Sequence, residues 1–420
     1  MTTHNDETSL TNSTTPYAVF GLPDYRRYFI GNLLGILGHQ MLTLAVSWEI
    51  YERTGSKLKL GYIGLVQYLP ILLFTLPAGQ IADRYNRKKI LILTIGLTTF
   101  VGLAMFWLSA RQGSVNLIYA CLFLNGLARA FQGPARAAFV TQIVPREIFA
   151  NAVAWGSNSF EIATIAGPAL GGLMIALFGK PTMVYGIVAL VAFTNLILLA
   201  GIKTHQKQAQ REPIKLQGLI AGLKFVWHSK IIVASITLDL FAVLLGGAVT
   251  LLPIYAKDIL QVGPTGLGWM RAAPSIGAVL MSLFIAHRAP MRKAGWTLIL
   301  AVAGFGGATI VFGLSRSFWL SMLMLFLIGA FDNISVIIRH TLVQLQTPDD
   351  MRGRVSSVNS LFIGTSNELG GYESGVTAEY FGTEVSVVAG GLGTILVVAI
   401  VSFIWPQLRK YGRLGMAETK

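Results

Sequence analysis

Long uninterrupted runs of apolar residues limit what this chain can fold into. They include the runs 90–110, 182–200, 297–314 and 385–405, and a helix of about 20 apolar residues crosses the hydrocarbon core of a bilayer. In lipid only helices and closed barrels satisfy every backbone group, and these runs are too long for barrel strands. Charged residues make up only 12% of the chain, about half the fraction of a soluble protein, and the mean hydropathy is +0.61. The sequence therefore predicts an all-α membrane protein.

The apolar runs indicate twelve membrane-spanning helices, six on each side of a polar central stretch, with the seventh expected at 231–255. The first 24 residues are rich in Thr, Ser, Asn and Asp without an apolar segment, so we expect a disordered tail and not a signal peptide. The second part of the central stretch has apolar residues at helical spacing and a basic face, which is typical of an amphipathic helix on a membrane surface. The expected division is a cytoplasmic tail at 1–24, a six-helix bundle at 25–202, a cytoplasmic linker with the amphipathic helix at 203–230, a six-helix bundle at 231–406 and a cytoplasmic tail at 407–420.

The formal net charge of +14 could indicate a nucleic-acid partner, so the placement of the basic residues matters. Most of the 33 Lys and Arg residues fall in loops and tails on the side of the membrane that both termini share. This asymmetry follows the positive-inside rule, which predicts that both termini are cytoplasmic. The basic charge therefore indicates topology in the cell membrane, the cytoplasmic or inner membrane, and no nucleic-acid partner is expected.

The two halves of the chain repeat with an offset of 203 residues. The segment LFLNG at 122–126 matches LFLIG at 325–329, and the same offset aligns Arg136 with Arg339. Two six-helix halves related by an axis along the membrane normal are the plan of one class of secondary transporter. We therefore expect two pseudo-symmetric bundles.

Ionisable and polar side chains lie inside several of the expected spans. A charge there costs at least about 2.5–3.5 kcal/mol on insertion scales, so these groups face a cavity or a partner and not lipid. Spans 3, 6, 9 and 12 hold no ionisable side chain in their apolar cores, which makes them peripheral. Near the midplane we expect a cavity for protons or substrate formed by His39, Gln40, Glu161, Asp239, Arg271 and Glu368.

Asp239 and Glu368 are the leading candidates for proton coupling, with Glu161 third. A carboxyl group that moves between a desolvated cavity and the neighbourhood of an arginine would bind and release a proton during alternating access. Arg271 would be an electrostatic partner of these acids or a contact for an anionic group of the substrate. The alternative for each residue is a static pair between helices.

Arg129 and Asp332 occupy equivalent positions of the two repeats, in the cytoplasmic half of spans 4 and 10. Opposite charges at equivalent positions suggest a pair that closes an inner gate. The alternative is that each side chain only stabilises its own helix.

The loop between the second and third spans carries a recognisable motif. Its sequence is Gly79-Gln-Ile-Ala-Asp83-Arg84-Tyr-Asn-Arg87-Lys88-Lys89, which resembles the signature loop of the major facilitator superfamily. The resemblance implies a conformational switch in which the Asp pairs with the other half of the protein and holds the outward-open state. Asn86 replaces the second Gly of the signature, and because Asn tolerates positive φ we expect the tight turn to be kept. The residues of the expected switch are Gly79, Asp83, Arg84, Arg87 and Lys88.

The fifth span ends in a second motif, formed by Gly167, Pro168, Gly171 and Gly172. It resembles the antiporter motif of exporters in this superfamily, whose fuller form has a Gly where this chain has Ala163. Ordinary packing of glycines against a neighbouring helix is the alternative. The resemblance covers about residues 25–405 and is closest to the branch that contains the enterobactin exporter and macrolide-efflux proteins. An acid is common in the first span of that branch, where this chain has His39-Gln40.

These features predict a secondary active transporter that exports a small amphipathic compound, such as a drug or siderophore, in exchange for protons. A proton symporter for uptake is the first alternative. An enzyme or non-transporting receptor is disfavoured, because the sequence lacks His-Glu-x-x-His, Gly-x-Ser-x-Gly and a P-loop. No cofactor or metal is expected, and the single Cys121 allows neither an intrachain disulfide nor a thiolate cluster. The resemblance also implies a monomer in the lipid bilayer.

Overall fold

The structure, a computed structural model, describes residues 15–203, 223–287, 293–348 and 351–412. Over these residues it is built from helices, without a strand. The long helices of the first half are α2 (Pro23–Thr54), α3 (Lys57–Arg84), α4 (Arg87–Ala110), α5 (Val115–Ile143), α6 (Phe149–Phe178) and α7 (Thr182–Ala200). Those of the second half are α9 (Lys230–Leu245), α11 (Gly263–Ala286), α12 (Ala294–Leu314), α13 (Phe318–Gln346), α14 (Arg352–Phe381) and α15 (Thr383–Ile404). Shorter elements are η1 (Ala18–Gly21), η2 (Arg146–Ile148), η3 (Ala248–Leu251), α10 (Leu252–Ile254), η4 (Tyr255–Ile259) and α16 (Pro406–Lys410).

Ten helical segments in the described residues are long and apolar enough to cross a membrane, with α9 and its continuation to Ile259 taken as one. The two further spans predicted from the sequence correspond to α5 and α14, which have 29 and 30 residues but are more polar. Charged side chains lower their apolar character: Arg129 and Arg136 on α5, Glu368 and Glu373 on α14. The predicted all-α membrane fold is thus confirmed, and both of these helices carry predicted site residues, Arg129 on α5 and Glu368 on α14.

The chain divides into two compact units. The first contains the described residues up to Ala45 and from Leu69 to the end of α7. The second contains Val46–Tyr68 and the described residues from Leu223 onward. The connected ends of α2 and α3 therefore group with the second half, whereas the sequence had assigned them to the first bundle. Their contacts with α11 and α14, described below, explain this division.

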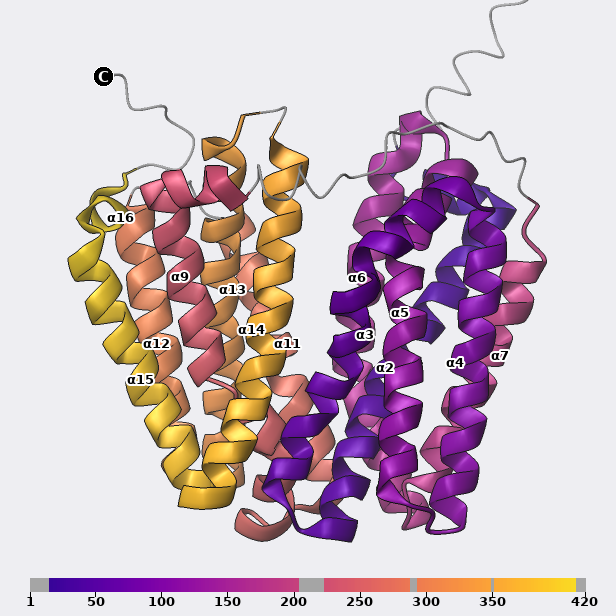
Figure 1. The fold of residues 1–420 in the computed structure, drawn as a ribbon, viewed down its shortest axis with the longest axis horizontal. Helices are drawn as coiled ribbons and strands as arrows, with labels where there is room; N and C mark the ends of the chain where they lie inside the picture. Colours follow the sequence, from indigo (N-terminus) through magenta and orange to yellow (C-terminus); the bar gives the residue numbers. More distant parts are fainter. Residues whose placement is uncertain (1–14, 204–222, 288–292, 349–350, 413–420) are drawn as a thin grey trace, which may run out of the picture. The chain divides into compact units, whose positions relative to one another are not determined.

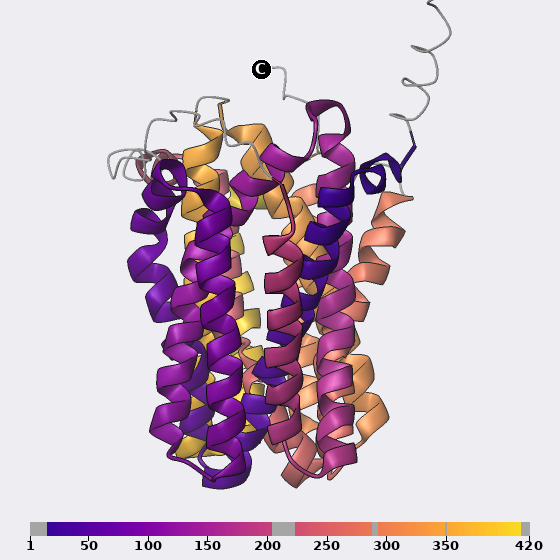
Figure 2. The ribbon, with the colours of Figure 1, turned by 90° about the vertical axis from the view of Figure 1, so that its right-hand side faces the viewer.

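Each unit contains the same kind of close contact between its third and sixth helices. In the first unit α4 packs against α5 and α7, and the three helices run side by side (Figures 1 and 2). A Cβ added to Gly102 of α4 would lie 3.0 Å from the backbone of Ala189 on α7. In the second unit α12 packs against α15, where a Cβ on Gly306 would lie 2.9 Å from the carbonyl oxygen of Gly391. The small residues thus bring the third and sixth spans of each half together.

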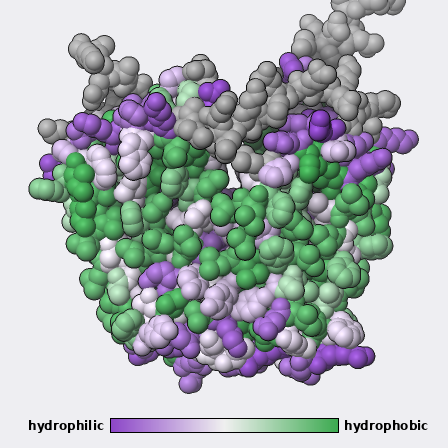
Figure 3. Space-filling view, viewed as in Figure 1, coloured by the Kyte–Doolittle hydropathy of each residue, from purple (hydrophilic) through white to green (hydrophobic). Residues whose placement is uncertain are grey.

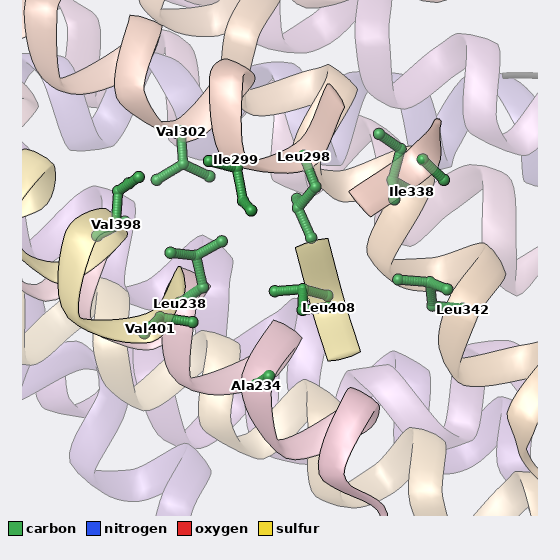
Figure 4. Close-up of a cluster of buried hydrophobic side chains, with 12 residues drawn as sticks. Ala234, Leu238, Leu298, Ile299, Val302, Ile338, Leu342, Val398, Val401 and Leu408 are labelled. Atoms are coloured by element: carbon green, nitrogen blue, oxygen red, sulfur yellow. The ribbon is translucent and has the colours of Figure 1, made fainter. Parts of the chain in front are cut away.

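One buried cluster of apolar side chains holds the second unit together. Figure 4 shows it between α9, α12, α13, α15 and α16. Leu238 of α9, Leu298 of α12 and Leu342 of α13 are each at most 1% exposed. Leu408 of α16 is fully buried in the same cluster, so packed structure continues past residue 406, where the sequence predicted a tail.

Large apolar side chains are also exposed on the outside of the helices. Leu93 on α4 is 73% exposed and Phe403 on α15 is 88% exposed. The surface of Figure 3 is mostly hydrophobic along the length of the helices, and hydrophilic side chains gather near their ends. An exposed apolar surface of this extent fits a bilayer and not water. The helices with these side chains, α4 and α15, are among the spans predicted to be peripheral.

Several predicted boundaries differ from the structure. Residues 18–21 form η1 and Val19 is fully buried against Tyr25, so packed structure begins within the expected tail. Residues 1–14 of that tail, residues 204–222 of the expected linker and residues 413–420 lie outside the described residues, and residues 223–228 are helical. The seventh span breaks at Gly246-Gly247, where α9 gives way to η3, α10 and the π turn η4. Glycine disfavours helix and Pro253 lacks a backbone donor, which explains the interruption.

Candidate functional site

A cavity of about 200 Å³ lies inside the first unit, between α2, α4, α5, α6 and α7. His39 of α2 lines it, together with Arg129 and Arg136 of α5. Seven residues separate the two arginines, which is two helical turns and places both on one face of α5. The remaining polar lining is Thr98, Asn125, Gln132 and Asn195, and the walls are apolar.

Hydrogen bonds link the cavity's polar side chains. The Arg136 guanidinium donates from Nη2 to Gln132 Oε1 at 3.3 Å. The Gln132 amide in turn donates from Nε2 to Thr98 Oγ1 on α4, also at 3.3 Å. These bonds fix the Gln132 amide between the two helices and position the guanidinium beside the cavity. The Oδ1 atom of Asn125 is buried without a hydrogen-bond partner in the described structure.

The antiporter-like motif lies on α6, and its glycines let α6 pack closely against α2. Gly167 and Gly171 are buried, and a Cβ on Gly167 would lie 2.5 Å from Gln40 Cβ and 3.1 Å from Leu37 O. A Cβ on Gly171 would lie 3.4 Å from Met41 Cα. Gln40 therefore faces α6, whereas the adjacent His39 lines the cavity. Pro168 and Gly172 are buried in the same helix, and Glu161 is half-buried on it.

The basic residues of the expected switch loop make hydrogen bonds to neighbouring helices. Arg87, at the start of α4, donates from Nη1 to the carbonyl oxygen of Ala138 on α5 at 3.3 Å. Lys88 Nζ donates to the carbonyl oxygens of Ala200 and Ile202 at 2.8 and 2.7 Å, at the C-terminal end of α7. Cations at a helix C-terminus stabilise its exposed carbonyl groups. This part of the loop thus ties α4 to its neighbours within the first unit.

The other switch residues end α3. Gly79 and Asp83 are half-buried and Arg84 is exposed. The expectation of positive φ at Asn86 is wrong: its φ is −63°. Its side chain instead accepts a hydrogen bond from the backbone N–H of Lys89 at 3.1 Å and caps α4. Asn suits this position because it is among the best N-cap residues.

An ion pair lies inside the second unit. Asp239 of α9 pairs with Arg339 of α13, and their exposed fractions are 6% and 2%. Asp332 is seven residues before Arg339 on the same helix, and it lines a cavity of about 10 Å³ together with Asp239 and Ser335. Asp239 therefore pairs with Arg339 and shares a small cavity with Asp332, between α9 and α13.

Arg271 and Glu368 also belong to the second unit. Arg271 on α11 donates from Nη1 to Ser47 Oγ at 3.3 Å and lies close enough to Glu368 of α14 to interact electrostatically. The Glu368 carboxylate sits against Gly64 of α3, where an added Cβ would clash with it. Arg271 and Glu368, both predicted site residues, are thus brought together.

The turn between α2 and α3 is also tied into the second unit. Glu379 Oε2, near the end of α14, accepts hydrogen bonds from the backbone N–H groups of Lys57 (2.8 Å) and Leu58 (3.1 Å). These amides open α3 and have no partner within it, so the carboxylate caps the helix. The Tyr51 hydroxyl of α2 donates a hydrogen bond to Asp258.

Three side chains with buried or capping contacts were not among the site residues predicted from the sequence. Arg136 and Arg339 were counted among the cytoplasmic charges, whereas Arg136 lines the cavity of the first unit and Arg339 pairs with Asp239 inside the second. The repeat could have identified the two arginines, because Arg136 and Arg339 align at the same 203-residue offset as Arg129 and Asp332. Glu379 lies at the end of a span, and nothing in the sequence indicated that it caps α3. Arg129 and Asp332 lie in different units, and their pairing stays a prediction.

No group of three or more His, Cys, Asp and Glu side chains suited to a metal occurs in the part of the chain that the structure describes. The polar groups of both units are instead arranged as pairs and hydrogen-bonded chains around small cavities.

Sequence relatives are transporters. The enterobactin exporter EntS of Escherichia coli O81 (strain ED1a) is 25% identical over 391 residues, which cover 93% of each protein. The EntS of Shigella boydii serotype 18 (strain CDC 3083-94 / BS512) is similar to the same extent.

Solved structures share the fold. A peptide transporter POT matches with a TM-score of 0.74 at 11% identity, covering 93% of this chain and 95% of that one. A D-xylose-proton symporter matches with a TM-score of 0.70 at 12% identity, covering 93% and 99%. A bacterial homologue of the human lysosomal transporter Spinster has a TM-score of 0.70 at 15% identity, covering 95% and 99%. The model of one family, described as a transmembrane secretion effector, matches residues 14–416. This chain therefore belongs to that family of the major facilitator superfamily and is a multi-pass membrane transporter, not an enzyme.

Proposed function

We propose that the protein is a proton-coupled exporter of a small amphipathic compound, such as a drug or siderophore, that works by alternating access. The 25% identity to enterobactin exporters over 93% of the chain supports export. The close approach of α6 to α2 at Gly167 agrees with the antiporter-like motif having a structural role in such a carrier.

The single observation that carries the coupling proposal is the buried Asp239–Arg339 pair, whose carboxylate shares a small cavity with Asp332. One guanidinium neutralises one of the two carboxylates, and a second negative charge in a nearly dry site is costly unless it gains a proton or a partner. A conformational change that alters the distance between α9 and α13 would shift Arg339 between the acids and so change their affinity for protons. Glu368 lies close enough to Arg271 to interact with it electrostatically and is the second candidate for coupling.

We further propose that the protein resides in the cytoplasmic membrane as a monomer with both termini in the cytoplasm. The excess of Lys and Arg on the side of the termini supports this orientation. The monomeric state is what the family resemblance implies.

Everted membrane vesicles test the direction of transport. They are energised to be acidic inside and given a cationic probe, ethidium, or an anionic one, carboxyfluorescein. An exporter driven by proton exchange accumulates at least one probe in the lumen, and a protonophore abolishes the accumulation. Accumulation only under the opposite gradient, alkaline inside, would establish symport and contradict the proposal.

Variants test the coupling residues in purified proteoliposomes. Asp239→Asn, Asp332→Asn and Glu368→Gln are each expected to reduce the proton flux that accompanies probe transport by at least tenfold. Glu384→Gln is the matched control, because Glu384 pairs with Arg316 at an exposed position. Undiminished proton flux in all three variants would remove these acids from the mechanism.

A further inference from the structure

Three basic side chains gather at the C-terminal end of α7, which packs against α4 within the first unit (Figures 1 and 2). The Arg27 guanidinium of α2 donates from Nη1 to the carbonyl oxygen of Gly201 at 2.8 Å. Lys88 of α4 donates to two further backbone carbonyl oxygens at the same helix end. Lys203 follows two residues after Gly201 and is exposed. These three cations are called the α7-end cluster.

The α7-end cluster has an excess of positive charge. Arg27 forms an ion pair with Asp24, with 3.4 Å between Nη1 and Oδ1. The groups that Lys88 binds are carbonyl oxygens, which carry no formal charge. Among the described residues, neither Lys88 nor Lys203 forms an ion pair. Three cations therefore share one carboxylate at this helix end.

The α7-end cluster also keeps donors for a further ligand. An ammonium group has three N–H donors, and Lys88 uses two of them. Both hydrogen bonds of Arg27 in the described structure start from Nη1, and its side chain is 47% exposed. A phosphate group suits this arrangement, because a guanidinium binds two of its oxygens at once and an ammonium binds it as a point charge.

An exposed apolar stripe leads along α7 to the same helix end. Leu190, Phe193 and Ile197 are 64%, 49% and 56% exposed. Their spacing of three and four residues places them on one face of the helix, which is called the α7 stripe. At roughly 1.5 Å per residue, α7 rises about 16 Å from Leu190 to Gly201, which is close to half the thickness of a bilayer's hydrocarbon core. The α7 stripe thus has the length of one leaflet.

We infer that the α7-end cluster and the α7 stripe together form a binding site for an anionic phospholipid. The cluster holds the phosphate, and an acyl chain lies along the stripe. A phospholipid is the membrane component that combines a phosphate with an apolar chain of this length. Under the proposed orientation the site lies in the cytoplasmic leaflet, where basic pockets between helices bind anionic head groups. This site goes beyond the proposed export function and does not depend on which compound is transported.

Native mass spectrometry of the purified, delipidated full-length protein tests the inference. The probes are phosphatidylglycerol, phosphatidylcholine with the same acyl chains, and glycerol 1-phosphate, which has the phosphate without the chains. Phosphatidylglycerol is expected to bind at least fivefold more tightly than phosphatidylcholine, and a tenfold excess of glycerol 1-phosphate should not displace it. Equal binding of phosphatidylcholine would refute the role of charge. Displacement by glycerol 1-phosphate would refute the role of the stripe, and absence of phosphatidylglycerol binding would refute the site.

Variants locate the site. Arg27→Gln and Lys203→Gln are each expected to weaken phosphatidylglycerol binding about fivefold, the loss typical of one basic residue near an anionic membrane surface. Arg111→Gln is the matched control. It removes the same charge from an exposed position at the other end of α4, where the guanidinium stacks on Trp107, and should leave binding unchanged.

Wild-type affinity in both cluster variants would overturn the assignment. A loss of the same size in Arg111→Gln would also overturn it, because the net charge of the protein and not the α7-end cluster would then set the affinity. If a cluster variant does not fold, the comparison of the three probes on the wild-type protein still decides.

Discussion

Arg339 on α13 forms an ion pair with Asp239 on α9 inside the second unit, and both side chains are almost fully buried. Removing one partner of a buried pair leaves an uncompensated charge and typically costs about 3–5 kcal/mol. We expect Arg339→Met alone and Asp239→Leu alone to lower the unfolding temperature of the purified protein strongly. The double variant should recover most of the loss. A double variant as unstable as the sum of the singles would show that the two residues are not coupled.

Gly167 is predicted to be a packing requirement of α6. An added methyl group would meet Gln40 of α2 at a distance that real Cβ atoms do not reach, so Gly167→Ala should cost about 1–3 kcal/mol of folding free energy. Gly156 lies on the same helix with open space around it, and Gly156→Ala should be neutral or slightly stabilising. Chemical denaturation in detergent compares the two variants. Equal stability would contradict the close contact of α6 and α2.

Glu379 is predicted to hold the start of α3 through its two backbone hydrogen bonds. Its replacement by Ala should cost about 0.5–2 kcal/mol, as for other helix caps. Glu384→Ala is the control, because its ion pair with Arg316 is exposed and such pairs contribute at most about 1 kcal/mol. Hydrogen exchange of the amides of Lys57 and Leu58 is the direct readout. Faster exchange is expected only in the Glu379 variant.

The switch loop separates into a structural and a conformational part. Lys88 bonds two carbonyl oxygens at the end of α7, so Lys88→Met should lower the stability of the first unit. Asp83→Asn should leave stability unchanged and reduce transport of the vesicle probe, because the family resemblance assigns Asp83 to the switch. Melting curves and vesicle transport, measured on both variants, test the separation. Equal losses of stability would argue for a structural role of Asp83.

The sequence was sufficient for the fold. The apolar runs long enough to span a bilayer follow from solvation in lipid, which acts on every span in the same way, and the 203-residue repeat predicts that the two halves share one arrangement. The pairing of polar side chains was predicted only in part. Arg271 was expected to be a partner of Asp239 and Glu368 or a contact for a substrate anion; it lies near Glu368, whereas Asp239 pairs with Arg339, which was not predicted.

The failures have a physical cause. In the sequence, an arginine near the end of a span is interpreted as a cytoplasmic charge. Only the packing of α13 against α9 makes Arg339 a buried partner of Asp239. Asn86 illustrates the same limit at short range. Asn is favoured both at positive φ and as an N-cap, and the start of α4 decides between the two uses.

The interruption of the seventh span has a mechanical consequence. Between Leu245 and Leu252 the regular hydrogen-bond ladder of α9 stops, and a π turn follows at Tyr255–Ile259. A continuous helix acts as a stiff rod that tilts as one piece. With this joint the span is not one stiff rod, so a tilt of α9, which carries Asp239, is not transmitted undiminished to the segment beyond Gly247.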